Sequence, residues 1–146
     1  MNLRSMQRGF TLIELLLVIG IIAILAAIVI VAINPTKQLS DARNAQRRAD
    51  VNTILNAVTQ YSIDHTGMLP ETITTTATEI CRSGVNIDCM GLINLNVLTG
   101  SYILALPNDP ETGTETSTKY VISKDGKSIT VAAPDAEAGL TISVKH

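Results

Sequence analysis

A long apolar run occupies the N-terminal part of the chain, from Phe10 to Ile33. Within it only Thr11, Glu14 and Gly20 are not strongly apolar. As an α-helix, this run would extend roughly 36 Å, which exceeds the ~30 Å thickness of the hydrocarbon core of a bilayer. The pattern therefore predicts a membrane-spanning helix over residues 10–34.

The pattern changes after Asn34-Pro35, where Asn is a favourable N-cap and Pro a favourable first helical residue. From about 38 to 66, apolar residues return at three- and four-residue spacings, which predicts an amphipathic helix. Gly67 is a suitable C-cap for this helix, and Pro70 would prevent its continuation. The apolar positions of the pattern are Leu39, Ala42, Ala45, Ala49, Val51, Ile54, Leu55, Val58, Tyr61 and Ile63.

The C-terminal third of the chain has the pattern of strands. Residues 118–123 and 128–133 are rich in β-formers and are separated by Asp125-Gly126, a hairpin-turn pair. Residues 140–145 predict a third strand, whereas 68–117 has mixed signals and is expected to form variable loops. We therefore predict an α+β fold in which about three antiparallel strands, over 118–145, pack against one face of the long helix.

The charge distribution predicts the direction of insertion and argues against two classes of function. Arg4 and Arg8 precede the apolar run, so the N-terminus should stay in the cytoplasm and the C-terminal domain should be exported. The formal net charge is −2, which disfavours nucleic-acid binding through bulk charge. No enzyme is expected, because the only histidines, His65 and His146, have no evident catalytic or metal-binding partners.

The apolar run differs from a secretory signal peptide and from a plain anchor. It is longer than the ~7–15 apolar residues of a signal peptide, and it contains Glu14, whose charge would cost several kcal/mol in lipid if it were unpaired. A cut after Gly9 would create an α-amine on Phe10, a cation at neutral pH, about one helical turn from Glu14. This amine could pair with Glu14 of its own chain or of a neighbouring chain.

The residues Gly9-Phe10-Thr11-Leu12-Ile13-Glu14, preceded by a short basic leader over 1–9, resemble the processing site of type IV prepilins and the related pseudopilins. The resemblance implies cleavage between Gly9 and Phe10 by a prepilin peptidase, N-methylation of Phe10, and a role for Glu14 in assembly. It implies a globular domain over 35–146 that is exported from the plasma or inner membrane into a filament. The implied partners are further copies of the chain, other pilin-like subunits, an assembly platform in the membrane and, before assembly, lipid.

Three functions remain open at this point. The favoured one is the subunit of a pilus that serves adhesion, motility or DNA uptake. The second is a pseudopilin of a type II secretion system, which the turn Leu106-Pro-Asn-Asp-Pro110 keeps open because it resembles one found in major pseudopilins. The third, from another class, is a membrane-tethered binding domain that never polymerises.

The same turn raises the question of a metal. In some pseudopilins the loop that follows it binds calcium, and Asp109, Glu111 and Glu115 offer oxygen ligands here. Calcium takes six to eight oxygens, so we favour a turn that is capped by its own side chains. No cofactor is expected.

Two smaller groups of residues also allow a functional and a structural interpretation. Arg43, Arg47 and Arg48 are interpreted as a solvated helix face, and the alternative is contact with a neighbouring subunit or with anionic lipid headgroups. Cys81 and Cys89 are the only cysteines, and in an exported domain such a pair favours a disulfide over two free thiols.

Overall fold

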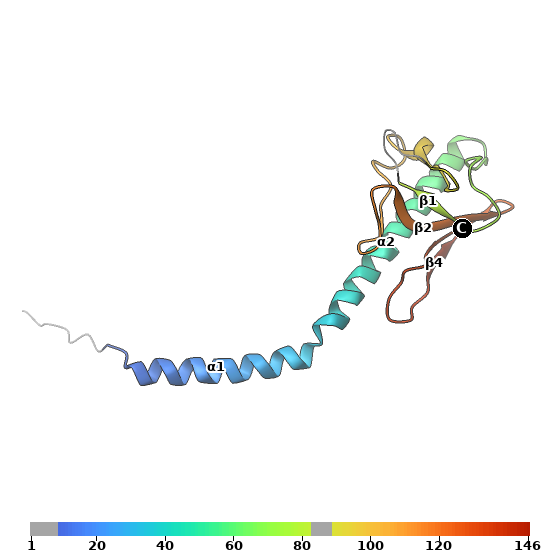
Figure 1. Ribbon diagram of the computed structural model, residues 1–146. Helices are drawn as coiled ribbons and strands as arrows, with labels where there is room; N and C mark the ends of the chain where they lie inside the picture. Colours follow the sequence, from blue (N-terminus) through green and yellow to red (C-terminus); the bar gives the residue numbers. More distant parts are fainter. Residues whose placement is uncertain (1–8, 83–88) are drawn as a thin grey trace, which may run out of the picture. The chain divides into compact units, whose positions relative to one another are not determined.

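The computed structural model describes residues 9–82 and 89–146, and the chain divides after Gln38 into two units. Helix α1 (Leu12–Ile33) lies in the first unit. Helix α2 (Pro35–Asp64) begins in the first unit and continues into the second, which also contains the sheet (Figure 1). The helix expected over about 38–66 thus starts at Pro35.

Helix α1 is bounded by Thr11 and Asn34. Thr11 is its N-cap, and Asn34 ends the helix with a left-handed backbone, φ 48°. The Oδ1 atom of Asn34 also accepts a hydrogen bond from the Lys37 backbone N–H at 3.3 Å, which confirms the predicted N-cap of the following helix. Helix α1 has a mean hydropathy of 3.5 and no buried residue, so its length and composition suit a membrane span.

The buried face of α2 differs from the predicted apolar face in its first turns. Leu39, Ala42, Ala45 and Ala49 are exposed, and Leu39 retains 55% of its accessible surface. The buried residues are Asn44, Arg47, Asp50, Val51, Ile54, Leu55, Ala57 and Val58. The inward face therefore begins with polar side chains and becomes apolar only from Val51 onward. The helix ends as predicted before Gly67, which has φ +84° and donates its N–H to the Ser62 carbonyl.

The sheet has four antiparallel strands in the order β1-β2-β3-β4 rather than about three. Their bounds are β1 (Thr78–Cys81), β2 (Ser117–Asp125), β3 (Ser128–Ala133) and β4 (Ile142–Lys145), and a 3₁₀ helix, η1 (Asn96–Leu98), lies between β1 and β2. Strand β1 falls in the region expected to be loops. Its four residues are too few to give a clear strand pattern in the sequence. Its register with β2 also shifts between Glu79 and Cys81. The turn after Asp125 is confirmed, because Asp125 pairs with Ser128 across Gly126 and Lys127.

The core of the second unit lies between α2 and the inner face of the sheet. Alternate residues of β2 and β3 point into it, including Tyr120, Ile122 and Val131, and they share one buried cluster with Ile54 and Val58 of α2. The Tyr120 hydroxyl donates a 2.7 Å hydrogen bond to Asp50, so this buried phenol keeps a polar partner. The α+β fold with a helix on an antiparallel sheet is therefore the one that the sequence predicts.

Cys81 and Cys89 form a disulfide with an S–S distance of 2.02 Å. The bridge joins the end of β1 to the segment that precedes Ile93, whose backbone carbonyl accepts the Cys81 N–H at 2.9 Å. This pairing is the one that the sequence favours over two free thiols.

Candidate functional site

The predicted processing site lies immediately before α1. Gly9 and Phe10 are outside the helix and exposed, and Phe10 retains 80% of its accessible surface. A side chain built on Gly9 would meet no atom within 4 Å. Any requirement for glycine at this position therefore comes from a partner that binds the segment, not from the fold of the described chain.

Glu14 and Thr11 form a capping box at the start of α1. The Oε2 atom of Glu14 accepts hydrogen bonds from the backbone N–H of Thr11 at 3.0 Å and from its hydroxyl at 2.8 Å. The Glu14 N–H donates in return to the Thr11 hydroxyl oxygen at 3.3 Å. Among the described residues, no partner engages the second carboxylate oxygen, Oε1. One oxygen of Glu14 is thus held by its own helix, and the other is available to a group from outside the chain.

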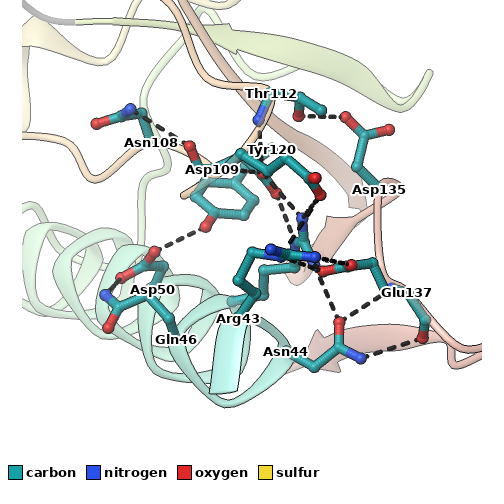
Figure 2. A network of polar contacts seen from close by, with 12 residues as sticks. Arg43, Asn44, Gln46, Asp50, Asn108, Asp109, Thr112, Tyr120, Asp135 and Glu137 are labelled. Atoms are coloured by element: carbon teal, nitrogen blue, oxygen red, sulfur yellow. Dashed lines mark hydrogen bonds and ion pairs between the residues drawn. The ribbon is translucent and has the colours of Figure 1, made fainter. Parts of the chain in front are cut away.

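In the second unit, Arg47 is the centre of a buried polar network. Figure 2 shows other members of this network, among them Asn44, Asp109 and Glu137. Its side chain is 0% exposed and binds Asp109 through two hydrogen bonds, Nε to Oδ2 at 2.6 Å and Nη2 to Oδ1 at 3.0 Å. Its Nη1 donates to Glu137 at 2.7 Å and to the Asn44 side-chain oxygen at 3.1 Å. The hydrogen bond to Asp109 raises the pKa of Arg47 more than burial lowers it, so this guanidinium stays charged in the interior.

Asp109 anchors the loop before β2 to this arginine. Its Oδ1 also accepts the backbone N–H groups of Glu111 and Thr112, at 2.9 and 3.0 Å, so the predicted self-capped turn is present. The loop is tightly wound, because a Cβ on Gly113 would come within 2.6 Å of the Asp109 carbonyl oxygen. Burial would raise the pKa of Asp109, but the hydrogen bonds from Arg47 and from the two N–H groups outweigh it and lower this pKa to about 2.

Glu137 ties the loop between β3 and β4 to the same part of α2. Its carboxylate binds both Arg43 and Arg47, with Arg43 Nε at 2.7 Å from Oε2. Asn44 holds the backbone of Glu137 from both sides, donating to its carbonyl at 3.1 Å and accepting from its N–H at 3.0 Å. The hydrogen bonds from Arg43 and then Arg47 lower the pKa of Glu137 to about 2.

These two carboxylates predict that acid destabilises the second unit. Both pKa values are lower in the folded chain than the ordinary values of 3.8 and 4.5, so the unfolded chain binds more protons and stability rises with pH across this window. The stabilisation is complete above about pH 5 and is lost as the pH falls from about 4.5 towards 2. We expect the melting temperature of the full chain in detergent, followed by tyrosine near-UV circular dichroism, to fall across this range. A melting temperature that stays constant down to pH 2.5 would contradict the assignment.

The structure does not bring the three calcium candidates together. Asp109 is engaged by Arg47, Glu111 lies 3.5 Å from Arg43, and Glu115 lies 3.6 Å from Arg82. Within the described ranges, no group of three or more His, Cys, Asp or Glu side chains is arranged to hold a metal ion. An arginine of the chain itself thus supplies the positive charge beside Asp109.

The interpretation of all three arginines as a solvated face is wrong for Arg47 and Arg43. Arg47 is fully buried and the Arg43 side chain is 21% exposed, whereas Arg48 is exposed. A signal for this arrangement is present in the sequence, because Arg47 lies seven residues before Ile54, on the helical face that carries the core. Its acidic partners are separated from it by 62 and 90 residues, a pairing that helix periodicity does not indicate.

Comparison with known proteins finds a match at the N-terminus and a similarity along most of the chain. Residues 4–30 match the family model of the prokaryotic N-terminal methylation motif. The chain is also 29% identical over 143 residues to the type II secretion system core protein G of Escherichia coli (strain K12), a match that covers 95% of this chain and 90% of that protein. No solved structure matches.

Proposed function

We propose that this chain is a structural subunit of the type IV pilin and pseudopilin kind that polymerises through α1 into an extracytoplasmic filament, because it matches the N-terminal methylation motif and is similar to a type II secretion core protein. The observation that supports this most is the N-terminal helix itself. Every residue of α1 is exposed, and its only acidic residue, Glu14, lies in its first turn. Such a helix requires either lipid or other copies of itself around it.

The precursor is anchored in the membrane by α1, with Arg4 and Arg8 on the cytoplasmic side. A prepilin peptidase removes residues 1–9 and leaves Phe10 as the new N-terminus, which is then N-methylated. Removal of the leader leaves nine basic and 13 acidic residues, a formal charge of −4. The polymerising subunit is therefore acidic, and its only new cation is the amine on Phe10.

This amine provides an electrostatic attraction between subunits that the uncleaved precursor lacks. Glu14 keeps Oε2 on Thr11 of its own chain, and its free Oε1 accepts the Phe10 amine of a neighbouring copy. In the filament interior, a misplaced subunit would leave this carboxylate buried and unpaired, which costs several kcal/mol. Glu14 would thus set the register in which neighbouring α1 helices pack. During assembly, the apolar surface of each α1 helix exchanges its contacts with lipid for contacts with other α1 helices. A membrane assembly platform and other pilin-like subunits are the partners that this route requires.

Gly9→Leu tests the processing step directly. We expect the variant to insert in the membrane but to keep residues 1–9, because a Cβ at this position has no atom of the described residues within 4 Å and the larger side chain would be rejected by the peptidase. Mass spectrometry of the N-terminus, with Gly20→Leu as a matched change in the same segment, measures this. Gly20→Leu should be processed normally, and a Gly9→Leu chain that starts at Phe10 would refute the assigned cleavage site.

A pseudopilin of a type II secretion system is the second candidate, and the similarity to core protein G over 95% of the chain favours it. The pilus subunit, with a role in adhesion, motility or DNA uptake, was the favoured function from the sequence. The two differ in the phenotype of a deletion strain. Loss of surface fibres without a change in secreted proteins would indicate a pilin, and loss of protein secretion would indicate a pseudopilin. A mature protein that never enters sedimentable fibres would support the non-polymerising binding domain.

A further inference from the structure

The guanidinium of Arg47 is surrounded by oxygen atoms from α2 and from two loops. Asp109 directs both of its carboxylate oxygens at it, at 2.6 and 3.0 Å. Glu137 contributes an oxygen at 2.7 Å, the Asn44 side chain contributes one at 3.1 Å, and Glu111 lies 3.7 Å away. Carboxylates and amide carbonyls are also the ligands that hold calcium in proteins. In this chain they are directed at a cation that the chain itself supplies.

The arrangement of these oxygens fits a guanidinium and not a metal ion. Asp109 meets the edge formed by Nε and Nη2 of Arg47, whereas Glu137 and Asn44 meet Nη1, so the oxygens follow a planar fork. Calcium would require six to eight oxygens around one point at 2.3–2.6 Å. The side chain of Arg47 is 0% exposed and fills the centre of the shell. A metal ion could enter only by displacing it.

We propose that Arg47 takes the structural part of a calcium ion in this chain, so that the second unit holds its loops without a divalent metal. The cation belongs to α2, and it therefore binds the loop before β2 whatever the calcium concentration outside the membrane. Through Glu137 it fixes the loop between β3 and β4 as well. The inference concerns the folded unit and holds whether or not the chain polymerises.

The same geometry predicts the effect of removing the guanidinium. Arg47→Ala leaves three carboxylates around the space that the side chain filled, those of Asp109, Glu111 and Glu137. Arg43 alone then offsets their charge. Carboxylates held close together without a cation repel one another, and a divalent ion in this space would relieve the repulsion. The variant should therefore be less stable and should gain a response to calcium that the wild type lacks.

The melting temperature of the full chain in detergent, followed by tyrosine near-UV circular dichroism, tests this with a calcium chelator and with added calcium. For the wild type we expect the two values to agree within about 1 °C. For Arg47→Ala, about 10 mM calcium should raise the melting temperature by roughly 5 °C, the shift that a millimolar site gives to a domain of this size. Sodium chloride at the same ionic strength screens charge without coordination, so it should not reproduce the rise.

Two further variants isolate the positive charge at this position. Arg47→Lys keeps a cation in the shell but loses the planar fork, so it should be less stable than wild type and still insensitive to calcium. Arg48→Ala removes the same charge from the next, exposed position of the helix and should respond to calcium as the wild type does.

Each outcome decides for or against the substitution of a metal by Arg47. A wild-type melting temperature that falls with the chelator and recovers with calcium would overturn it, even if Arg47→Ala did not fold. An Arg47→Ala chain that responds no more than Arg48→Ala would overturn it as well, and so would a calcium response in Arg47→Lys as large as that of Arg47→Ala. An Arg47→Ala chain that folds only when calcium is present would support it most directly.

Discussion

Arg47→Met is expected to lower the free energy of unfolding of the second unit by about 3–5 kcal/mol. The change leaves Asp109, only 2% exposed, without the cation that faces both of its carboxylate oxygens. It also removes one of the two arginines that hold Glu137. Because two loops are fixed to α2 through this side chain, we expect both to detach and the domain to lose a large part of its total stability.

Chemical denaturation of the full chain in detergent, followed by the near-UV signal of Tyr61, Tyr102 and Tyr120, measures this effect. Arg48→Met is the matched control, since it removes an identical side chain from the next position of the same helix. Being exposed, that change should cost less than about 0.5 kcal/mol. Equal destabilisation by the two substitutions would show that the buried network is not what holds the loops.

Glu14→Ala should abolish most fibre formation, with a drop of at least about ten-fold in sedimented material, because each subunit interface would contain an unpaired amine. The variant should still insert and still be cleaved after Gly9, since an apolar residue at this position favours insertion. The measurement is the ratio of sedimented to membrane-held chain, together with the mass of the N-terminus. Fibre yield equal to that of wild type would contradict the role of Glu14 in register.

A second substitution separates the charge of Glu14 from its capping role. Glu14→Gln keeps an oxygen that can accept from Thr11 but removes the negative charge, and we expect it to assemble as poorly as Glu14→Ala. Thr11→Ser keeps the hydroxyl that both donates to and accepts from Glu14, so it should assemble normally. If Glu14→Gln assembled and Glu14→Ala did not, the helix cap rather than the ion pair would be the decisive feature.

Much of the molecule could be read from local sequence, and the successful predictions share a physical cause. The membrane span depends on one uninterrupted apolar run, the break at Asn34 on an N-cap followed by proline, and the hairpin on the Asp125-Gly126 pair. Each of these signals acts over a few neighbouring residues. The processing motif is equally local, which is why the family resemblance was evident from residues 9–14 together with the basic leader and the apolar run that follows.

The features that local patterns missed depend on contacts between distant segments. Strand β1 has four residues, and its strand character depends on pairing with β2 more than 30 residues away. Arg47 belongs to the interior because Asp109 and Glu137, far along the chain, supply the charges that make its burial tolerable. The sequence by itself thus determined the apolar N-terminal helix, which suits a membrane span, and the α+β class. Only the tertiary structure decided which of the arginines on α2 are internal and which is exposed, because the burial of a charge depends on partners that the chain brings together only when it folds.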